Sequence, residues 1–212
     1  MSRDRVFHLV TFVVAASAVG LQFVLVVQGH HVLDETNRPP VGTRIVRFWS
    51  YLTIWGNVLL AGSVLALGCG RVPVGRVGRA LRLDAVVLIG VIAIVHFVLL
   101  RPLLDLHGPD LVADKMLHLV VPALGVLGWL VFGPRGVAGA GDILASVLLP
   151  VLWLGYTLLR GAITDWYPYP FLDVTEHGYA VVLANCLGVA LLLLGLTWGA
   201  VRLDARLNRE SR

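Results

Sequence analysis

The sequence has little charge. Only 14% of its 212 residues are charged, whereas 58% are apolar and the mean hydropathy is +0.83. Soluble domains carry about 25% charged residues, so this composition excludes an ordinary soluble fold. Lysine is almost absent, because Lys115 is the one lysine among 17 basic residues. A net charge of +4 made mostly of arginine does not indicate a nucleic-acid partner, and we expect none.

Cysteine is also scarce. The two cysteines, Cys69 and Cys186, fall near opposite faces of the membrane in the topology predicted below, about 20 Å apart in depth. A disulfide requires Cα atoms within about 7 Å, so we expect none. No internal repeat is visible, which removes the usual sequence indication of a transporter built from inverted halves.

Long apolar runs dominate what is present. A helix needs about 20 apolar residues to cross a membrane, and six runs bounded by charge, proline or glycine approach that length. They predict an all-α polytopic membrane protein: one membrane domain over residues 1–212, a bundle of six transmembrane helices. The expected spans are 6–27, 48–67, 84–104, 116–132, 143–163 and 179–201.

The distribution of charge predicts the orientation of these spans. With the N-terminus inside, most arginines lie in cytoplasmic segments, and most acidic residues lie on the opposite side. The positive-inside rule therefore places both termini in the cytoplasm, which agrees with an even number of spans. The expected location is a multi-pass protein of a cell membrane, with membrane lipids as its partners.

Polar side chains at membrane depth are informative because they are costly unless they are paired or face a cavity. In the predicted topology several helices contribute such groups to one layer near the outer surface. The residues of this layer are Thr53, Asn57, His96, His118, Tyr156, Arg160, Thr164 and Asn185.

Each of these residues has a structural interpretation as well. Thr53 can bond the carbonyl one turn earlier, His96 can be a satisfied core histidine, and the asparagines can join helices. Asp114 precedes His118 by four residues, so a carboxylate on the same helix face can orient the imidazole. Alternatively, Asp114 caps the fourth span.

No metal site and no cofactor are predicted. His30 and His31 are adjacent, point different ways on any regular element and lack a third ligand at a recognisable spacing. The external loop 164–178 is rich in aromatic residues between prolines, which indicates a belt at the lipid headgroups or, less simply, a lid over a substrate.

Four segments resemble the bacterial six-transmembrane family called Pr-six-Pr, and the similarity covers nearly the whole chain. They are FWSYLTIWGN at 48–57, LHLVVP at 117–122, GPRG at 133–136 and RGAITDWYPYPF at 160–171. That family is distantly similar to the androgen-induced-gene and androgen-dependent TFPI-regulating proteins, which are membrane hydrolases of lipid esters, including fatty acid esters of hydroxy fatty acids, that use one threonine and one histidine.

The resemblance implies that Thr53 is a nucleophile and His118 its base, in a threonine-type lipid esterase near the outer leaflet of a bacterial plasma membrane. Orienting or oxyanion support is expected from Asp114, Asn57, Tyr156 or Arg160, and further pocket residues are His96 and Asn185. The alternative is a non-enzymatic protein that binds lipid or only packs helices.

Overall fold

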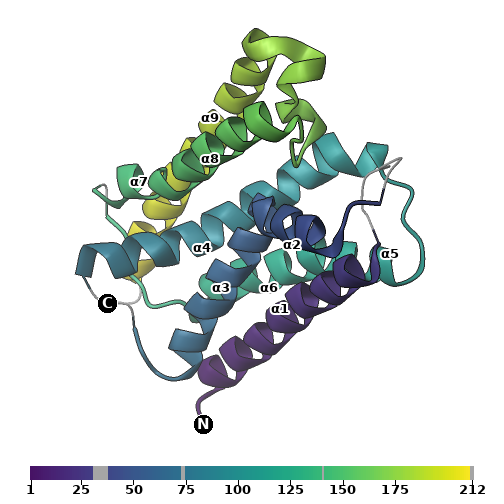
Figure 1. Ribbon diagram of the computed structural model, residues 1–212. Helices are drawn as coiled ribbons and strands as arrows, with labels where there is room; N and C mark the ends of the chain where they lie inside the picture. The colour runs from purple at the N-terminus through teal and green to yellow at the C-terminus, as the bar shows by residue number, and fades with distance from the viewer. Residues whose placement is uncertain (31–37, 73–74, 140, 211–212) are drawn as a thin grey trace.

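The computed structural model describes residues 1–30, 38–72, 75–139 and 141–210, and every regular element among them is helical (Figure 1). The α-helices are α1 (Arg3–Gln28), α2 (Val41–Ser50), α3 (Leu52–Gly68), α4 (Gly75–Val95), α5 (Gly108–Lys115), α6 (Val121–Phe132), α7 (Asp142–Ala145), α8 (Leu148–Thr164) and α9 (Val174–Glu210). Two π-helical turns, η1 (His96–Leu100) and η3 (Met116–Val120), and two 3₁₀ turns, η2 (Arg101–Leu103) and η4 (Pro170–Leu172), complete the set.

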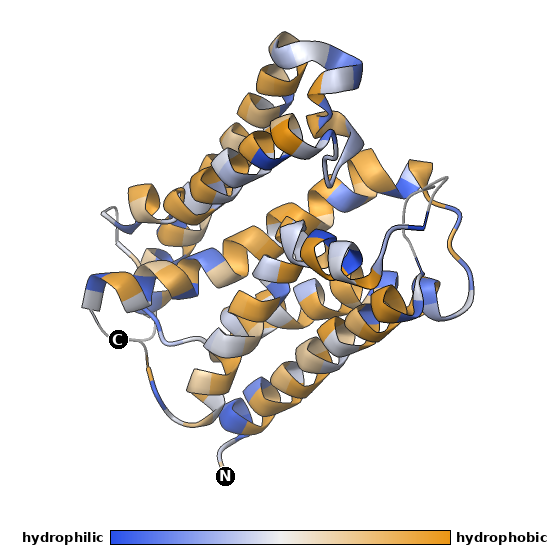
Figure 2. Ribbon diagram, in the orientation of Figure 1, coloured by the Kyte–Doolittle hydropathy of each residue, from blue (hydrophilic) through white to orange (hydrophobic). Residues whose placement is uncertain are grey.

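Among the described residues, five helical segments are long and apolar enough to cross a membrane: Arg3–Gln28, Gly75–Leu103, Gly108–Phe132, Asp142–Thr164 and Val174–Arg209. A sixth results if α2 and α3, which meet at an angle of 67°, are counted as one bent span. Hydrophobic residues dominate the middle of the helices, while hydrophilic residues concentrate at helix ends and connections (Figure 2). This is the make-up of a membrane-embedded helical protein.

The helices differ from the expected spans at several places; the last helix, for example, continues to Glu210, past the expected residue 201. The second span is interrupted, because Tyr51 has an extended backbone (φ −78°, ψ 127°) that separates α2 from α3. The third helix begins at Gly75, before the expected residue 84. The fourth begins at Gly108, because α5, η3 and α6 follow one another directly, so Pro122 lies within a longer helical segment than expected.

The core of the bundle lies where α1, α3, α4 and α6 meet. Ala15 and Ala18 of α1 pack with Ile54 and Leu60 of α3 and with Leu88 of α4 in one buried cluster. Small residues permit the closest approaches: a Cβ added at Gly56 would stand 2.3 Å from a methyl carbon of Ile92, and at Gly125 2.7 Å from Leu60. A second buried cluster joins α8 and α9 through Trp153 and Val182, among others.

Both chain ends lie at one end of the bundle. The centroid of the Phe7 ring, near the start of α1, is 5.0 Å from that of the Phe132 ring at the end of α6. Asp204, near the end of α9, accepts hydrogen bonds from the backbone N–H groups of Val137 and Ala138, just after α6. At the opposite end His30 lies 2.7 Å from the Asp110 carboxylate. The polar layer described next lies between α3, α4 and α5–α6, toward this second end.

Candidate active site

Thr53 lies in the first turn of α3, directly after the break at Tyr51. The first N–H groups of a helix have no partner within the helix, so a break in mid-span leaves donors that must be satisfied otherwise. The side chain of Thr53 is 7% exposed, and its hydroxyl oxygen Oγ lies 3.4 Å from Nε2 of His118. A hydroxyl and an imidazole from separate helices are therefore neighbours.

His118 lies in the π-helical turn η3 and is held by the turn before it. Its Nδ1 is 3.0 Å from the backbone carbonyl oxygen of Asp114 and 3.0 Å from the carboxylate oxygen Oδ1 of the same residue. The carbonyl has hydrogen-bond geometry, whereas Oδ1 lies off the N–H direction and has no hydrogen-bond partner. Both neighbours of Nδ1 are acceptors, so Nδ1 bears the proton in the neutral ring. Nε2 is then free to accept a proton from Thr53.

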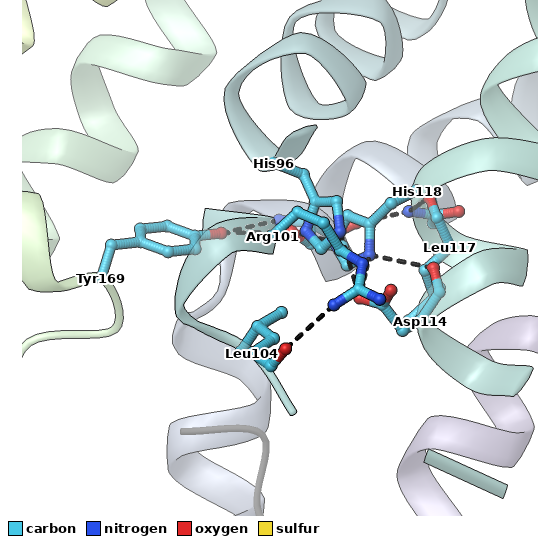
Figure 3. Close-up of polar contacts among 9 residues, drawn as sticks. His96, Arg101, Leu104, Asp114, Leu117, His118 and Tyr169 are labelled. Carbon is cyan, nitrogen blue, oxygen red and sulfur yellow. Dashed lines mark hydrogen bonds and ion pairs between the residues drawn. The ribbon is translucent and has the colours of Figure 1, made fainter. Parts of the chain in front are cut away.

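His96 stacks on His118 from the neighbouring helix. The centroids of the two rings are 3.7 Å apart, and the rings are nearly parallel, with an interplanar angle of 8° (Figure 3). His96 is 2% exposed, and its Nε2 lies 3.3 Å from Oδ1 of Asp114. His96 begins η1, so each histidine lies in a π-helical turn. Such turns change the direction of side chains along a helix and are frequent at functional sites.

Tyr169 reaches this group from the connection between α8 and α9 (Figure 3). Its hydroxyl oxygen accepts a hydrogen bond from the backbone N–H of Thr53 at 3.2 Å, and it also lies 3.2 Å from Thr53 Oγ. Because one lone pair is occupied by the N–H, the tyrosine O–H is free to donate to Oγ. Burial raises the pKa of Tyr169, so the phenol keeps its proton at neutral pH.

The site opens into a cavity of about 110 Å³, which we call the polar cavity. This is several times the roughly 10 to 15 Å³ that one water molecule requires. Arg44 also lines the polar cavity; its Nη2 donates to the carbonyl of Val27, while Nε and Nη1 are shielded from solvent without a hydrogen-bond partner. The residues that line it include Thr53, His96, Asp114, His118, Tyr169, Arg44 and Asp110.

A second cavity of about 110 Å³, the apolar cavity, lies on the other side of Thr53, between α3, α4, α8 and α9. Four residues line both cavities: Thr53, His96, Leu100 and Tyr169. Asp114 and His118 line the polar cavity alone. Thr53 therefore lies at the boundary between a space lined by several charged residues and a space lined mainly by apolar side chains.

His96, Asp114 and His118 together meet the distance requirement for a metal site, since one ligand atom from each lies within 4.8 Å of the others. The ring geometry does not fit as it stands. Imidazole binds a metal through a lone pair in the ring plane, and the lone pairs of two stacked, nearly parallel rings do not converge on one point. One ring would have to turn before an ion could bind. His31, which we also considered, lies outside the described residues.

The other residues expected at the site have different contacts. The amide nitrogen of Asn57 donates to the carbonyl of Thr53 at 2.8 Å, with a longer contact to that of Leu117, so this residue joins two helices. The Tyr156 hydroxyl lies 2.9 Å from Ser50 Oγ, Arg160 stands 4.8 Å above the Trp166 ring, and Asn185 donates to the carbonyl of Phe171. None of these four lines either cavity.

Two sequence-based interpretations are corrected here. Asp114 is not a helix cap, because α5 begins at Gly108 and Asp114 lies in its last turn beside His118. Tyr169 does not belong to a belt at the headgroups, since it is 7% exposed and bonded to Thr53. The sequence offered one sign of this role, the position of Tyr169 between Pro168 and Pro170, which restricts the backbone around it. Cys69 and Cys186 are both free, as expected.

Comparison of the chain with protein-family models, with curated proteins and with solved structures gives no match.

Proposed function

We propose that this protein hydrolyses lipid esters within the membrane, with Thr53 as the nucleophile and His118 as the general base. The observation on which this depends is the 3.4 Å contact between Thr53 Oγ and His118 Nε2 at the wall of a cavity. Catalytic pairs lie within about 3.2 Å in the reacting complex and are often further apart without substrate. The same two residues are supported by the distant similarity of the Pr-six-Pr family, which the chain resembles, to membrane hydrolases that use one threonine and one histidine.

The contacts around the pair define a sequence of proton transfers. Asp114 holds the proton of His118 on Nδ1, so Nε2 takes the proton of the Thr53 hydroxyl. Oγ attacks the ester carbonyl, and the C–O bond to the alcohol breaks as His118 returns the proton to the alcohol oxygen. Water, deprotonated by His118, then hydrolyses the acyl-threonine and restores both residues.

Tyr169 is the side-chain donor beside the reacting oxygen. Its O–H lies 3.2 Å from Thr53 Oγ, whereas the donors expected from sequence, Asn57, Tyr156 and Arg160, are engaged elsewhere. A neutral phenol that is buried from solvent stabilises developing negative charge without changing its own protonation state. Tyr169 therefore replaces those three residues as the oxyanion donor in the proposal.

The membrane arrangement in this proposal is six crossings, with both termini cytoplasmic. Counting α2 and α3 as one bent span gives an even number, and the contacts of α1 and α9 at one end of the bundle support this count. The active site then lies toward the extracytoplasmic leaflet, and membrane lipids reach it laterally. A bacterial plasma membrane is the proposed location.

The experiment compares the purified wild type with Thr53→Ala and His118→Ala. Hydrolysis of a long-chain ester and labelling by a fluorophosphonate probe are measured for each protein. We expect both variants to lose at least about 100-fold in rate, because a positioned base alone contributes about 10²- to 10⁴-fold. Thr157→Ala is the matched control, since Thr157 is also buried, on α8, and lines neither cavity.

Thermal unfolding in detergent shows whether each variant is folded before its activity is compared. Equal turnover and equal labelling in the wild type and in both folded variants would contradict the proposal. A protein that binds lipid and has no hydrolytic chemistry would then be the better interpretation.

A further inference from the structure

The wall of the apolar cavity is aliphatic over most of its extent. Val91, Ile92 and Val95 of α4 line it on one side, and Val151 and Leu154 of α8 on another. Its remaining wall on α9 is formed by Cys186, Val189, Ala190 and Leu193. Among the residues that the structure describes, none with a carboxylate or a basic side chain lines this cavity, apart from His96 at its boundary with the polar cavity. A cavity of this kind does not hold water well and suits an alkyl chain.

The positions of the two ends of an ester follow from the position of the base. In the proposed reaction His118 must reach the oxygen of the leaving alcohol and, later, the attacking water. His118 lines the polar cavity alone, whereas Thr53 lines both. The alcohol therefore leaves on the side of the polar cavity. The acyl group, attached to the opposite side of the same carbonyl carbon, extends the other way.

We propose that the apolar cavity is the acyl-chain site of the enzyme and that its walls on α4, α8 and α9 determine chain-length preference. This inference rests on the proposed function for the direction of the ester, but the cavity's affinity for a chain does not require catalysis. The long acyl chain stays in the apolar cavity in the acyl-threonine intermediate. The alcohol departs and water enters through the polar cavity.

Cys186 provides a direct probe of occupancy, because it is a free thiol on the cavity wall. In a Cys69→Ser protein Cys186 is the only thiol of the chain. The full-length protein is placed in nanodiscs of diether phosphatidylcholine, which has no ester to hydrolyse. Alkylation by N-ethylmaleimide is followed by mass spectrometry with hexadecanoate, with butanoate or with neither.

We expect hexadecanoate to slow alkylation by the factor 1 + [L]/Kd, about tenfold at a concentration nearly ten times Kd. Butanoate at the same concentration should leave the rate nearly unchanged, since its short chain buries far less apolar surface in the cavity than hexadecanoate does. Equal rates with and without hexadecanoate would overturn the assignment of this cavity. The same comparison in a Thr53→Ala background should give the same protection, because the chain is bound by the cavity wall.

Substitution at Ala190 tests the site by a second measurement. Ala190→Phe fills the apolar cavity, while Ala184→Phe adds the same ring to an exposed position of the same helix that lines neither cavity. Binding of radiolabelled hexadecanoate should weaken at least about tenfold in Ala190→Phe, which corresponds to about 1.4 kcal/mol, and stay unchanged in Ala184→Phe. Equal binding by the two variants would overturn the inference, whether or not the thiol reacts.

Ester hydrolysis separates this inference from the proposed function. For an active enzyme, Ala190→Phe should lower kcat/KM for hexadecanoyl esters at least about tenfold while butanoyl esters are hydrolysed as before. Loss of both activities together would contradict the acyl-chain assignment. A wild type that hydrolyses no ester but binds hexadecanoate, with Cys186 protected, would contradict the proposed chemistry and leave the apolar cavity as a chain-binding site.

Discussion

Replacing Tyr169 by phenylalanine removes one buried hydroxyl and leaves the ring in place. That hydroxyl is 3.2 Å from the backbone nitrogen of Thr53 and 3.2 Å from its Oγ. A net hydrogen bond contributes about 0.5 to 1.5 kcal/mol, and a buried donor left without a partner costs about 1 to 3 kcal/mol. Hydrogen bonds between membrane helices tend toward the lower values. We therefore expect Tyr169→Phe to lower the free energy of unfolding by about 1 to 3 kcal/mol.

Tyr169→Phe should also slow the acylation of Thr53, for a reason separate from its effect on stability. Loss of one oxyanion donor typically slows acylation about 100- to 1,000-fold. Since Tyr169→Phe keeps Thr53 and His118, fluorophosphonate labelling should be slower but still go to completion. A loss of labelling in proportion to unfolded protein alone would show that the hydroxyl only stabilises the fold.

Tyr167→Phe is the matched control for both measurements. Tyr167 is two residues away and also buried, but its hydroxyl forms no hydrogen bond within the described part of the chain. Thermal unfolding in detergent, followed by tryptophan fluorescence, should give a lower Tm for Tyr169→Phe and an unchanged Tm for Tyr167→Phe. If both variants unfold and label like the wild type, the Tyr169 hydroxyl does not hold Thr53 and the reasoning about this site is wrong.

Three further predictions concern the supports of the site. Gly161→Ala should cost about 1 to 3 kcal/mol of stability, because the added Cβ would stand 2.0 Å from the Tyr167 ring. It should also slow hydrolysis, because the ring would displace the loop that carries Tyr169. Gly155→Ala is the control on the same helix: its added Cβ meets nothing within 4 Å, so the Tm should not fall. Asn57→Ala should lower stability by about 0.5 to 2 kcal/mol, measured as a fall in Tm, because the bond to the Thr53 carbonyl is lost. Chelation by EDTA should leave ester hydrolysis unchanged; a loss restored by zinc would show that His96 turns and binds a metal with Asp114 and His118.

The membrane character of the fold could be predicted from hydropathy, because a bilayer requires long apolar helices with internally satisfied backbones. The helix boundaries could not be predicted as well. Arg76 and Arg79 precede the expected third span, yet α4 begins before them, because arginine has a good helix propensity and Arg79 pairs with Asp142 at 3.4 Å. Charge ends an apolar run without ending a helix.

Part of the site was also accessible from sequence. The spacing of four between Asp114 and His118 places both on one helix face, and the structure brings them together. Position in the membrane placed Thr53 and His118 at similar depths, but it could not give their rotation about the helix axes. Tyr169 lies in a loop whose path depends on tertiary packing, so no periodicity indicated that it would reach Thr53.

The break between α2 and α3 connects the cost of the fold with its chemistry. Unpaired backbone at membrane depth is tolerated only where it is buried or lines a cavity, and Tyr51, at the break, lines the polar cavity. A straight helix through Tyr51 would pair the Thr53 N–H within the helix and leave the Tyr169 hydroxyl without that donor. Because of the break, a helix N-terminus, which carries a partial positive charge, lies at Thr53 itself. In the proposed reaction, the helix end and Tyr169 together stabilise the negative charge that develops on the substrate beside Oγ. The interruption of the second span would thus contribute to catalysis.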